Sequence, residues 1–506
     1  MTHSVLMDDR TSNENLIALM RRTHECGTHW CADSRLLAHG DVFVACPGKQ
    51  GDGRAFIDAA IAAGASAILV HVDTVVGWQT AEYAVPLFAV VQLKNRLGAL
   101  ADLWYDQPSA SLTVVAVTGT NGKTSCVDWF AQALRNDGQK VGIIGTLGVT
   151  FPDGHVEPGQ LTTPDVITVH RTMARLREAG ATHIAMEASS IGLDQGRLDG
   201  VRIHIAGFTN LSRDHLDYHQ TMQSYEAAKS KLFAWPGLQH AILNLDDPVG
   251  VRLSHRMTCQ AVTYSISKQV DTATLTASEL RTDSIGMGFI LHALGKHVHV
   301  QSHALGSHNV SNLLCVSGLL KSLGWSLDKI SQAIADLAPV EGRLERVSSA
   351  LKDVSVPTVV VDYAHTPDAL ENACRTLKEL DPRRLITVFG CGGDRDKTKR
   401  PLMAAAAARH SDACVVTSDN PRSEDPLAII GEIESGLKGK TFRSIPDRAE
   451  AIDFAVQNSL SGDIILIAGK GHETTQQFAE ETIDFDDRKH ASKALRDRAQ
   501  AISDMR

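Results

Sequence analysis

A glycine-rich turn with a lysine and a threonine lies at residues 118–124, directly after an apolar run at residues 114–117. Gly119 and Gly122 allow a sharp turn that aims backbone N–H groups at phosphate oxygens. Lys123 carries a positive charge suited to the outer phosphates, and the hydroxyl of Thr124 can hold Mg2+. We therefore predict a site for ATP and Mg2+. The predicted ATP-binding residues of this turn are Gly119, Thr120, Asn121, Gly122, Lys123 and Thr124.

The turn departs from the usual phosphate-loop pattern, which has a glycine at the position of Val117. The residues that follow support the interpretation, because Val127, Phe130 and Leu134 recur at helical spacing and give one buried face. A helix that begins near Thr124 would point its partial positive end at the same anion. An ordinary strand–turn–helix corner is the alternative.

Two further segments that follow apolar runs concentrate carboxylates and histidines. Glu187 ends the run at residues 184–186, where a carboxylate beside a phosphate loop can bind Mg2+. The polar segment 209–219 also follows a strand, and it surrounds His215 with possible metal ligands and proton carriers. The alternatives are a carboxylate at a helix start and a structural histidine.

Four polar loops follow four apolar runs in the last part of the chain, at residues 362–365, 390–395, 418–422 and 469–473. Ligands in open α/β sheets bind at the carboxyl ends of strands, so these loops predict a second site. The glycines of the second loop do not match the dinucleotide spacing, which makes NAD binding a weak alternative.

A cluster of His24, Cys26, His29 and Cys31 could suggest zinc. Its spacing lacks the paired Cys-x-x-Cys and His-x-x-x-His pattern of structural zinc sites. If residues 28–32 form a strand, His29 and Cys31 share one face and either pack or face solvent. That interpretation is favoured over metal binding.

The composition excludes several classes of protein. A chain of 506 residues is too long for one compact domain and suggests three. The net charge of -9 argues against a nucleic-acid platform, and no apolar stretch approaches the length of a membrane span. The polar N-terminus, with Asp8, Asp9 and Glu14, is not a signal peptide, and nine scattered cysteines are typical of reduced thiols. We expect a cytoplasmic monomer without nucleic-acid partners or membrane insertion.

Apolar runs that alternate with helical stretches predict an α/β fold with doubly wound, mainly parallel sheets. A strand-rich flap is expected between residues 260 and 305. Linker candidates at residues 106–109 and 338–340 divide the chain into domains 1–108, 109–338 and 339–506. The apolar runs are at 114–117, 141–144, 184–186, 203–206, 241–243, 358–361, 385–389, 413–416 and 464–468.

Over nearly its whole length the chain resembles the Mur ligases, the ATP-dependent amide-forming enzymes of peptidoglycan assembly. The resemblance implies an N-terminal UDP-substrate-binding domain, a central P-loop-type ATP-binding domain and a C-terminal Rossmann-like amino-acid-binding domain. It rests on Asp33-Ser34-Arg35, residues 119–124, Thr162-Thr163-Pro164, Glu187, residues 210–218, Lys229, His308-Asn309, Gly342-Arg343 and residues 362–367, 392–397, 419–422 and 469–473.

Within the family, the chain is most similar to members that join meso-2,6-diaminopimelate to the D-glutamate γ-carboxylate of UDP-N-acetylmuramoyl-L-alanyl-D-glutamate through an acyl phosphate. The resemblance implies four catalytic residues, namely Lys123, Glu187, His215 and Lys229. The implied Mg2+ ligands are Thr124, Glu187, His215 and Lys229, the last as a carbamate. Further ATP contacts are Asn244, His308, Asn309 and Arg343. UDP-substrate contacts are Ser34, Lys49, Gln50, Thr162, Thr163, Ser190, Gln195 and Arg197. Diaminopimelate contacts are Arg395, Asp419, Asn420, Pro421, Arg422, Gly469 and Glu473.

The acceptor assignment depends on Arg422. Diaminopimelate differs from lysine by a second carboxylate, and an arginine offers that group a planar pair of donors. A lysine-adding or folylpolyglutamate-type ligase is therefore disfavoured. A P-loop kinase or ATPase, which would turn over ATP without an amino-acid acceptor, is the alternative from another class. One departure from the family is Ile191, where many members have histidine.

Overall fold

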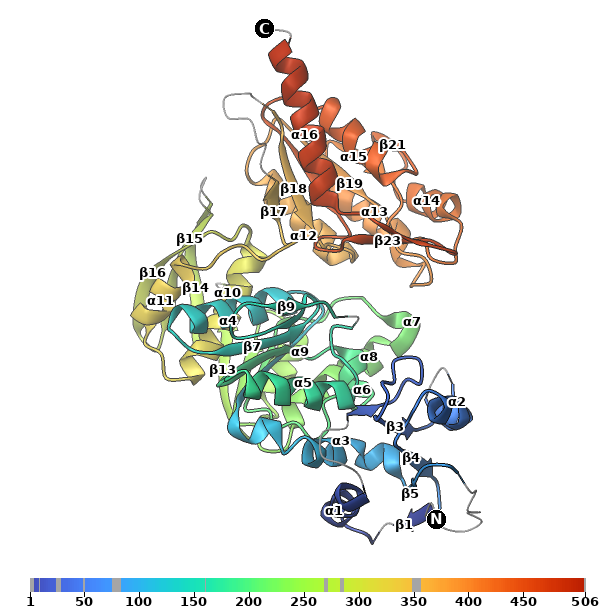
Figure 1. Ribbon diagram of the computed structural model, residues 1–506. Helices are drawn as coiled ribbons and strands as arrows, with labels where there is room; N and C mark the ends of the chain where they lie inside the picture. The colour runs from blue at the N-terminus through green and yellow to red at the C-terminus, as the bar shows by residue number, and fades with distance from the viewer. Residues whose placement is uncertain are drawn as a thin grey trace. The chain divides into compact units, whose positions relative to one another are not determined.

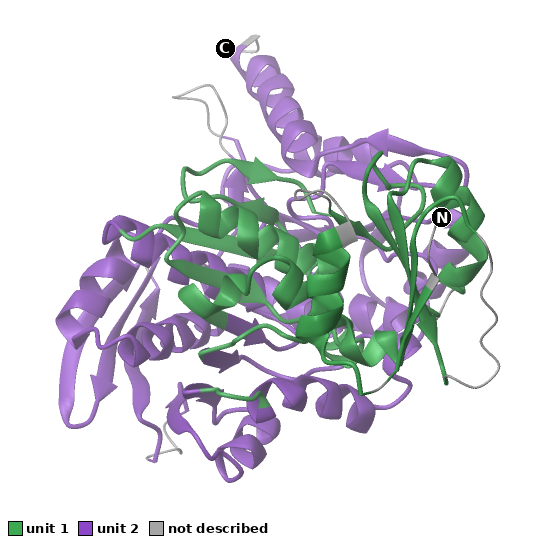
Figure 2. Ribbon diagram, turned by 60° about the horizontal axis from the view of Figure 1, so that its bottom comes forward, with its two compact units in different colours: residues 1–115, 139–204, 235–238 green, residues 116–138, 205–234, 239–506 purple. Residues whose placement is uncertain are grey.

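The computed structural model describes residues 4–8, 10–23, 29–48, 51–74, 83–159, 161–267, 272–282, 286–347 and 356–504. The chain folds into two compact units, which Figure 2 colours separately. Unit 1 comprises residues 1–115, 139–204 and 235–238, and unit 2 comprises residues 116–138, 205–234 and 239–506. Neither unit is a continuous stretch of chain, and the three domains predicted from the sequence stay a prediction.

Unit 1 contains a parallel sheet with the order β1-β5-β4-β3-β2. Its strands β3, β4 and β5 are buried along their whole length, as expected for a parallel sheet that is covered on both faces. The strands are β1 (Ser4–Met7), β2 (Trp30–Cys31), β3 (Val42–Ala45), β4 (Ala67–Val72) and β5 (Leu87–Val91). The helices are α1 (Asn13–Thr23), η1 (Gly53–Phe56), α2 (Ile57–Ala62), α3 (Leu93–Trp104) and η2 (Pro108–Ser111).

A second group of strands in unit 1 has the order β10-β7-β8-β9, with β10 parallel to β7 and the rest antiparallel. Glu187 is the last residue of β10, and the carboxylate of Asp165 caps the start of α5. The elements are β7 (Val141–Gly145), β8 (Gly148–Thr150), β9 (Val156–Glu157), α5 (Val166–Glu178), β10 (His183–Glu187) and α6 (Ser190–Asp194).

In unit 2, the strands β11, β12, β13 and β14 are parallel, and β15 and β16 continue the sheet in antiparallel fashion. The strand-rich segment predicted between residues 260 and 305 is therefore part of a sheet rather than a separate flap. The strands are β6 (Thr113–Thr118), which ends in unit 2, β11 (Ile205–Phe208), β12 (His240–Asn244), β13 (Gln260–Ser265), β14 (Leu275–Thr282), β15 (Met287–Ala293) and β16 (Lys296–Ser302).

Helices of this part of unit 2 begin at recognisable caps. The hydroxyl of Thr221 accepts a hydrogen bond from the N–H of Ser224 and caps the start of α8. The helix α10 is buried over most of its length, including polar side chains such as Asn309 and Asn312. The helices are α4 (Lys123–Asn136), α7 (Leu216–His219), α8 (Met222–Ser230), η3 (Lys231–Ala234), α9 (Pro248–Ser254), α10 (Ser307–Ser322) and α11 (Leu327–Ala335).

The last part of unit 2 is a sheet with the order β17-β18-β22-β19-β20-β21, parallel except for β17. Two apolar cores lie on its faces, one with α12, α13 and α14 and the other with α15 and α16 (Figure 1). The strands are β17 (Glu345–Val347), β18 (Thr358–Asp362), β19 (Arg384–Phe389), β20 (Ala413–Val416), β21 (Phe442–Ser444), β22 (Asp463–Ala468) and the hairpin β23 (Thr475–Gln477) and β24 (Thr482–Asp484). The helices are α12 (Pro367–Lys378), α13 (Lys399–His410), α14 (Pro426–Glu434), α15 (Arg448–Gln457) and α16 (Asp487–Asp504).

The predicted α/β class with mainly parallel sheets is confirmed. Because β18, β22, β19 and β20 run in the same direction, their carboxyl ends meet at one edge, where the four polar loops lie. The cysteines that the structure describes are free thiols. None of the described helices is both long enough and apolar enough to cross a membrane.

Asp463 offers a test of this sheet at its amino-terminal edge. The side chain is fully buried, and its carboxylate accepts hydrogen bonds from Arg383 (2.8 Å) and Arg384 (2.7 Å). Burial alone would raise the pKa of Asp463, but the two arginines and the N–H of Leu460 lower it to about 2. Since the pKa is lower in the folded chain than in the unfolded chain, the carboxylate stabilises the fold above about pH 4, and this contribution is lost as the pH falls toward about 2.

We predict that Asp463→Asn lowers the free energy of unfolding by about 1–2 kcal/mol at neutral pH. The value is modest because solvent screens the two half-exposed arginines. The deficit should shrink as the pH falls from about 4 toward 2. Thermal melting of parent and variant over this range measures it, and a deficit that does not change with pH would contradict the prediction.

Candidate functional site

The turn between β6 and α4 requires glycine at two positions. Gly119 and Gly122 have φ angles of 151° and 84°, which residues other than glycine rarely adopt. A Cβ atom at Gly119 would lie 1.8 Å from the hydroxyl oxygen of Thr209, and one at Gly122 would lie 2.2 Å from Oδ1 of Asn312. The backbone of the turn therefore lies directly against two polar side chains, and the helix α4 starts at Lys123 as predicted.

Two lysines bind the same carbonyl of this turn. Nζ of Lys123 donates to the carbonyls of Gly119 (3.0 Å) and Thr120 (2.9 Å), and Nζ of Lys229 donates to Gly119 at 2.7 Å. Lys229 is 2% exposed, and its burial, with the nearby charge of Lys123, holds its pKa well below the ordinary value. Lys229 is thus a buried amine of lowered pKa rather than a surface lysine.

His215 lies close to this pair of lysines, in the left-handed conformation (φ 53°) that precedes α7. Its Nε2 is 3.4 Å from Oδ2 of Asp214, and Nε2 of His365 is 3.9 Å from the same oxygen. Burial lowers the pKa of His215 to about 4. Burial would raise the pKa of Asp214, but His215, His365 and Lys399 lower it to about 2. A neutral imidazole and a carboxylate are both good ligands for a cation.

The segment after β11 is held against the turn by side-chain amides. The N–H of Asn121 donates to Oδ1 of Asn210 (2.9 Å), and the hydroxyl of Thr209 donates to the carbonyl of Asn121 (2.6 Å). Asn244, predicted as an ATP contact, donates from Nδ2 to the carbonyl of Thr209 at 2.7 Å. Its role in this structure is to position the segment that supports the turn.

The remaining predicted ATP contacts lie at α10 and after it. Nη2 of Arg343 donates to the hydroxyl of Thr124 at 3.0 Å. His308 and Asn309 stand in the first turn of α10, where Nδ2 of Asn312 donates to Oδ1 of Asn309 at 3.0 Å. Asn312 was missed from the sequence, although it follows Asn309 by three positions on the same helical face.

In unit 1 the structure gathers Glu187 with the predicted substrate contacts. Oε1 of Glu187 accepts from the N–H of Thr146 (2.8 Å), and the hydroxyl of Thr146 lies 3.0 Å from that of Thr162. The hydroxyl of Thr163 donates to the carbonyl of Glu187 (2.8 Å), and Arg197 donates to the carbonyl of Thr163 (2.7 Å).

The other predicted substrate contacts take different places in unit 1. Arg197 also donates to Oε1 of Gln195, at 2.7 Å from Nη2, so these two form one group with Thr163. Ser190 is buried at the start of α6. Ser34 lies in the loop after β2, whereas Lys49 and Gln50 lie outside the described residues.

Cationic and anionic side chains meet at the loops that follow the last sheet. Arg422, in a left-handed conformation (φ 55°), donates from Nη1 to the carbonyl of Gly393 at 2.7 Å. Burial lowers the pKa of Arg422, the neighbouring guanidinium of Arg395 lowers it further, and the carboxylates of Asp419 and Glu473 oppose that shift. The structure therefore brings the predicted acceptor residues together, and the group suits a ligand that carries both carboxylate and ammonium.

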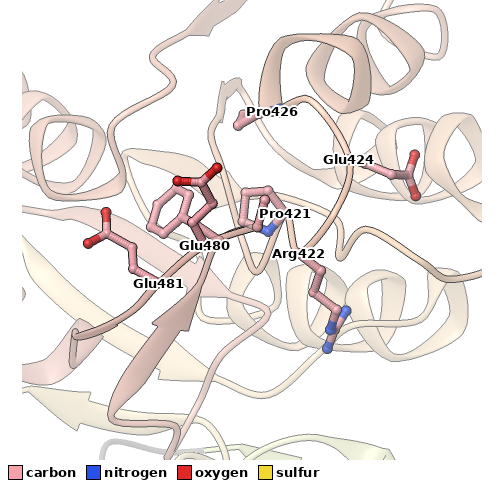
Figure 3. A pocket seen from close by; sticks show the side chains of 8 residues that line it. Pro421, Arg422, Glu424, Pro426, Glu480 and Glu481 are labelled. Atoms are coloured by element: carbon pink, nitrogen blue, oxygen red, sulfur yellow. The ribbon is translucent and has the colours of Figure 1, made fainter.

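An open pocket of about 550 Å³ adjoins Arg422 (Figure 3). The side chain of Arg422 extends away from Glu480 and Glu481, toward its carbonyl partner. The sequence pointed to Pro421 and Arg422, but the hairpin tip was missed because it lies far along the chain. The lining residues are Pro421, Arg422, Glu424, Pro426, Phe478, Ala479, Glu480 and Glu481.

Metal binding by unmodified side chains finds limited support. Among the described residues, no three histidine, cysteine or acidic side chains form a group that could hold a metal ion. Of the cluster considered for zinc, His24 and Cys26 lie outside the described residues, and Sγ of Cys31 contacts the carbonyl of Asp33 at 3.2 Å. The magnesium ligands implied by the resemblance include a hydroxyl and a modified lysine, and they stay a prediction.

Family models match three successive stretches of the chain. They are described as "Mur ligase family, catalytic domain" (residues 29–105), "Mur ligase middle domain" (117–320) and "Mur ligase, glutamate ligase domain" (342–471). Two relatives, both named UDP-N-acetylmuramoyl-L-alanyl-D-glutamate--2,6-diaminopimelate ligase, come from Janthinobacterium sp. (strain Marseille) and Pseudomonas aeruginosa. The first is 43% identical and covers 92% of this chain and 93% of its own, and the second is 44% identical with 92% and 94% covered.

Solved structures agree with this comparison. A structure described as UDP-N-acetylmuramoyl-L-alanyl-D-glutamate--2,6-diaminopimelate ligase has a TM-score of 0.63 and 34% identity, and it covers 92% of this chain and 94% of its own. The MurF ligase from Thermotoga maritima, solved in complex with ADP, has a TM-score of 0.66 with coverage of 94% and 98%. At 18% identity, the second likeness supports the fold alone.

The close fit of Gly122 gives a test of the phosphate-binding turn. We predict that Gly122→Ala weakens ATP binding by roughly tenfold or more, a loss of about 1.4 kcal/mol, since the methyl group would displace Asn312 and with it the turn. Isothermal titration with ATP measures this loss.

Gly138→Ala is the matched control, because φ is 83° and a methyl group there meets no described atom within 4 Å. It should cost about 1 kcal/mol of stability and leave ATP affinity unchanged. Equal loss of affinity in both variants would contradict the prediction.

Proposed function

The chain belongs to the Mur ligase family, and we propose that it is an ATP-dependent ligase that joins meso-2,6-diaminopimelate to UDP-N-acetylmuramoyl-L-alanyl-D-glutamate. The new amide forms on the γ-carboxylate of D-glutamate and serves the synthesis of peptidoglycan precursors. The observation that carries the proposal is the meeting of Arg422 and Arg395 with Asp419 and Glu473 at one sheet edge. Its substrates are small molecules, and we place the reaction in the cytoplasm.

The phosphate-binding turn activates the carboxylate. Backbone N–H groups at the start of α4 hold the triphosphate, while those of Thr120 and Asn121 are bound to Asn210. The ammonium of Lys123 offsets the charge that builds up as the γ-carboxylate attacks the γ-phosphorus. The P–O bond to ADP breaks and an acyl phosphate forms. The amine then attacks the carbonyl carbon, and phosphate leaves with its electron pair. Without Lys123, two anions would have to approach each other unassisted.

Magnesium fits the chemistry of the side chains near this turn. When bound, Mg2+ supplies charge stabilisation for the phosphoryl oxygens. The ligands proposed from the family resemblance are the hydroxyl of Thr124 and the carboxylate of Glu187, and also His215 and a carbamylated Lys229. The burial of Lys229, which lowers the pKa of its amine, supports this modification, because only a neutral amine adds CO2, and the product is an oxygen donor of the kind that Mg2+ prefers.

The acceptor loops select the amino acid by charge. Arg422 and Arg395 provide donors for carboxylates, and Asp419 and Glu473 provide partners for an ammonium group. With lysine in the site, the half-buried guanidinium of Arg422 would lack the second carboxylate that diaminopimelate brings, and that loss disfavours lysine. The UDP-linked substrate is proposed to contact Ser34, Lys49, Gln50, Thr162, Thr163, Ser190, Gln195 and Arg197.

We predict that the enzyme releases phosphate with UDP-N-acetylmuramoyl-L-alanyl-D-glutamate and meso-diaminopimelate at least about a hundredfold more efficiently, in kcat/KM, than with L-lysine. Arg422→Ala should remove most of this preference. Arg409→Ala removes an ion pair between α13 and Glu371 of α12, away from the acceptor loops. This variant should keep the preference for diaminopimelate. Equal use of both acceptors by the parent would overturn the specificity.

We predict that Lys229→Met lowers kcat by about a hundredfold or more, because a charge-stabilising ligand is lost. Lys231→Met, an exposed position two residues further on, is the control and should retain activity. With 13C-labelled bicarbonate, the parent should show a carbamate resonance that Lys229→Met lacks. A parent without that resonance would refute the carbamate, whatever the activity of the variant.

A further inference from the structure

Two fully buried cations lie beneath the acceptor loops. The side chains of Lys470, in the loop after β22, and Arg448, the first residue of α15, have no exposed surface. Burying a cation is costly unless partners at hydrogen-bond distance offset the lost hydration. The partners of these two cations therefore show what the burial accomplishes.

Lys470 closes a triangle with two predicted acceptor contacts. Its Nζ donates to Oδ1 of Asn420 and to Oε2 of Glu473, both at 3.0 Å. Nδ2 of Asn420 donates to the same Oε2 of Glu473 at 2.9 Å, and the N–H of Gln477 donates to Oδ1 of Asn420 at 3.0 Å. The network fixes the amide of Asn420 in one orientation and holds the carboxylate of Glu473 through one of its oxygens.

Arg448 joins the ends of two strands that do not pair with each other. Its guanidinium donates to the carbonyls of Ser418 (3.3 Å), after β20, and Ala468 (3.0 Å), at the end of β22. The sheet order places β19 between these strands, so main-chain pairing cannot hold their ends together. A bidentate pair with Asp487, at 2.7 Å for both bonds, fixes the guanidinium in turn.

Two acidic side chains share the acceptor site with these cations. Asp419 and Glu473 belong to adjacent loops, and Gly469 lacks the Cβ that would lie 2.4 Å from Oδ2 of Asp419. Both carboxylates act on the charge of Arg422, and like charges in one cluster repel each other. Cations fixed beneath them offset that repulsion without occupying the ligand's place.

We infer that Lys470 and Arg448 are positioning residues of the acceptor site, which hold Asn420, Glu473 and their loops in the binding arrangement before the amino acid arrives. Neither side chain contacts the amino acid. The inference rests on the proposed function, because it takes these loops to be the site of the incoming amine. It predicts that loss of either cation raises the KM for the amino acid and leaves the KM values for ATP and the UDP-linked substrate unchanged.

The test is steady-state kinetics of Lys470→Met, which keeps the length of the side chain and removes its charge. The KM for meso-diaminopimelate should rise by about ten- to a hundredfold, while the KM values for ATP and the UDP-linked substrate stay within about twofold. Lys470→Arg keeps the charge and should recover part of the loss. Arg384→Met is the matched control: it removes an ion pair with buried Asp463 at the opposite end of β22, and it should lower the melting temperature without changing any KM.

The outcomes distinguish failure of the proposed function from failure of the inference about Lys470 and Arg448. If the parent does not turn over diaminopimelate, the proposed function fails. If the parent is active and folded Lys470→Met keeps the parent's KM for the amino acid, the inference fails. It also fails if all three KM values rise together, since that marks a structural role only. If Lys470→Met does not fold, the variant Asp487→Asn is used instead. It weakens the ion pair of Arg448 and leaves its bonds to the two carbonyls, and its KM values are judged by the same criteria.

Discussion

The carbonyl of Gly119 accepts hydrogen bonds from both Lys123 and Lys229, and this crowding of two amines is the constraint on which the nucleotide site depends. Two ammonium charges at one buried oxygen repel each other, and burial together with the charge of Lys123 lowers the pKa of Lys229 well below its ordinary value. The site thereby contains a cation suited to phosphate and, beside it, an amine of lowered pKa that is suited to modification. Both lysines depend on the left-handed turn at Gly119, where a side chain would collide with the hydroxyl of Thr209.

The buried cations of the acceptor loops differ from Lys229 in the partners that surround them. Lys470 and Arg448 have carboxylate partners at hydrogen-bond distance, in Glu473 and Asp487, and the pair with Asp487 raises the pKa of Arg448 against the effect of burial. A buried cation with a carboxylate partner at hydrogen-bond distance acts as a fixed support, whereas burial and the charge of Lys123 lower the pKa of Lys229. Two buried lysines of one chain therefore take different roles, and the groups around each side chain decide which.

Sequence patterns predicted those features that depend on residues close to one another along the chain. The alternation of apolar runs and helices gave the fold class, and polar loops after those runs marked the site segments. The family resemblance alone pointed to Lys229 as a site residue, and its hydrogen bond to Gly119, 110 positions away, was not predicted, since no local pattern carries it. Arg448 was missed for a related reason: its partners lie in three other segments, and an arginine at a helix start has no distinguishing sequence signal. Asn312 was the exception, because helical spacing from Asn309 could have revealed it.

Within unit 2, side-chain contacts connect the two halves of the proposed chemistry. Arg343 donates to the hydroxyl of Thr124 in the phosphate-binding turn, and its guanidinium lies 4.5 Å from the ring centre of Tyr363. The ring of Tyr363 is 5.2 Å from that of His472, the neighbour of Glu473 in the acceptor loops. Activation of the carboxylate and delivery of the amine must occur at the same carbon, so the two loops have to keep a fixed separation when both ligands are bound. Arg343 contacts one loop directly and the other through an aromatic ring, and a change in its position alters the support of both.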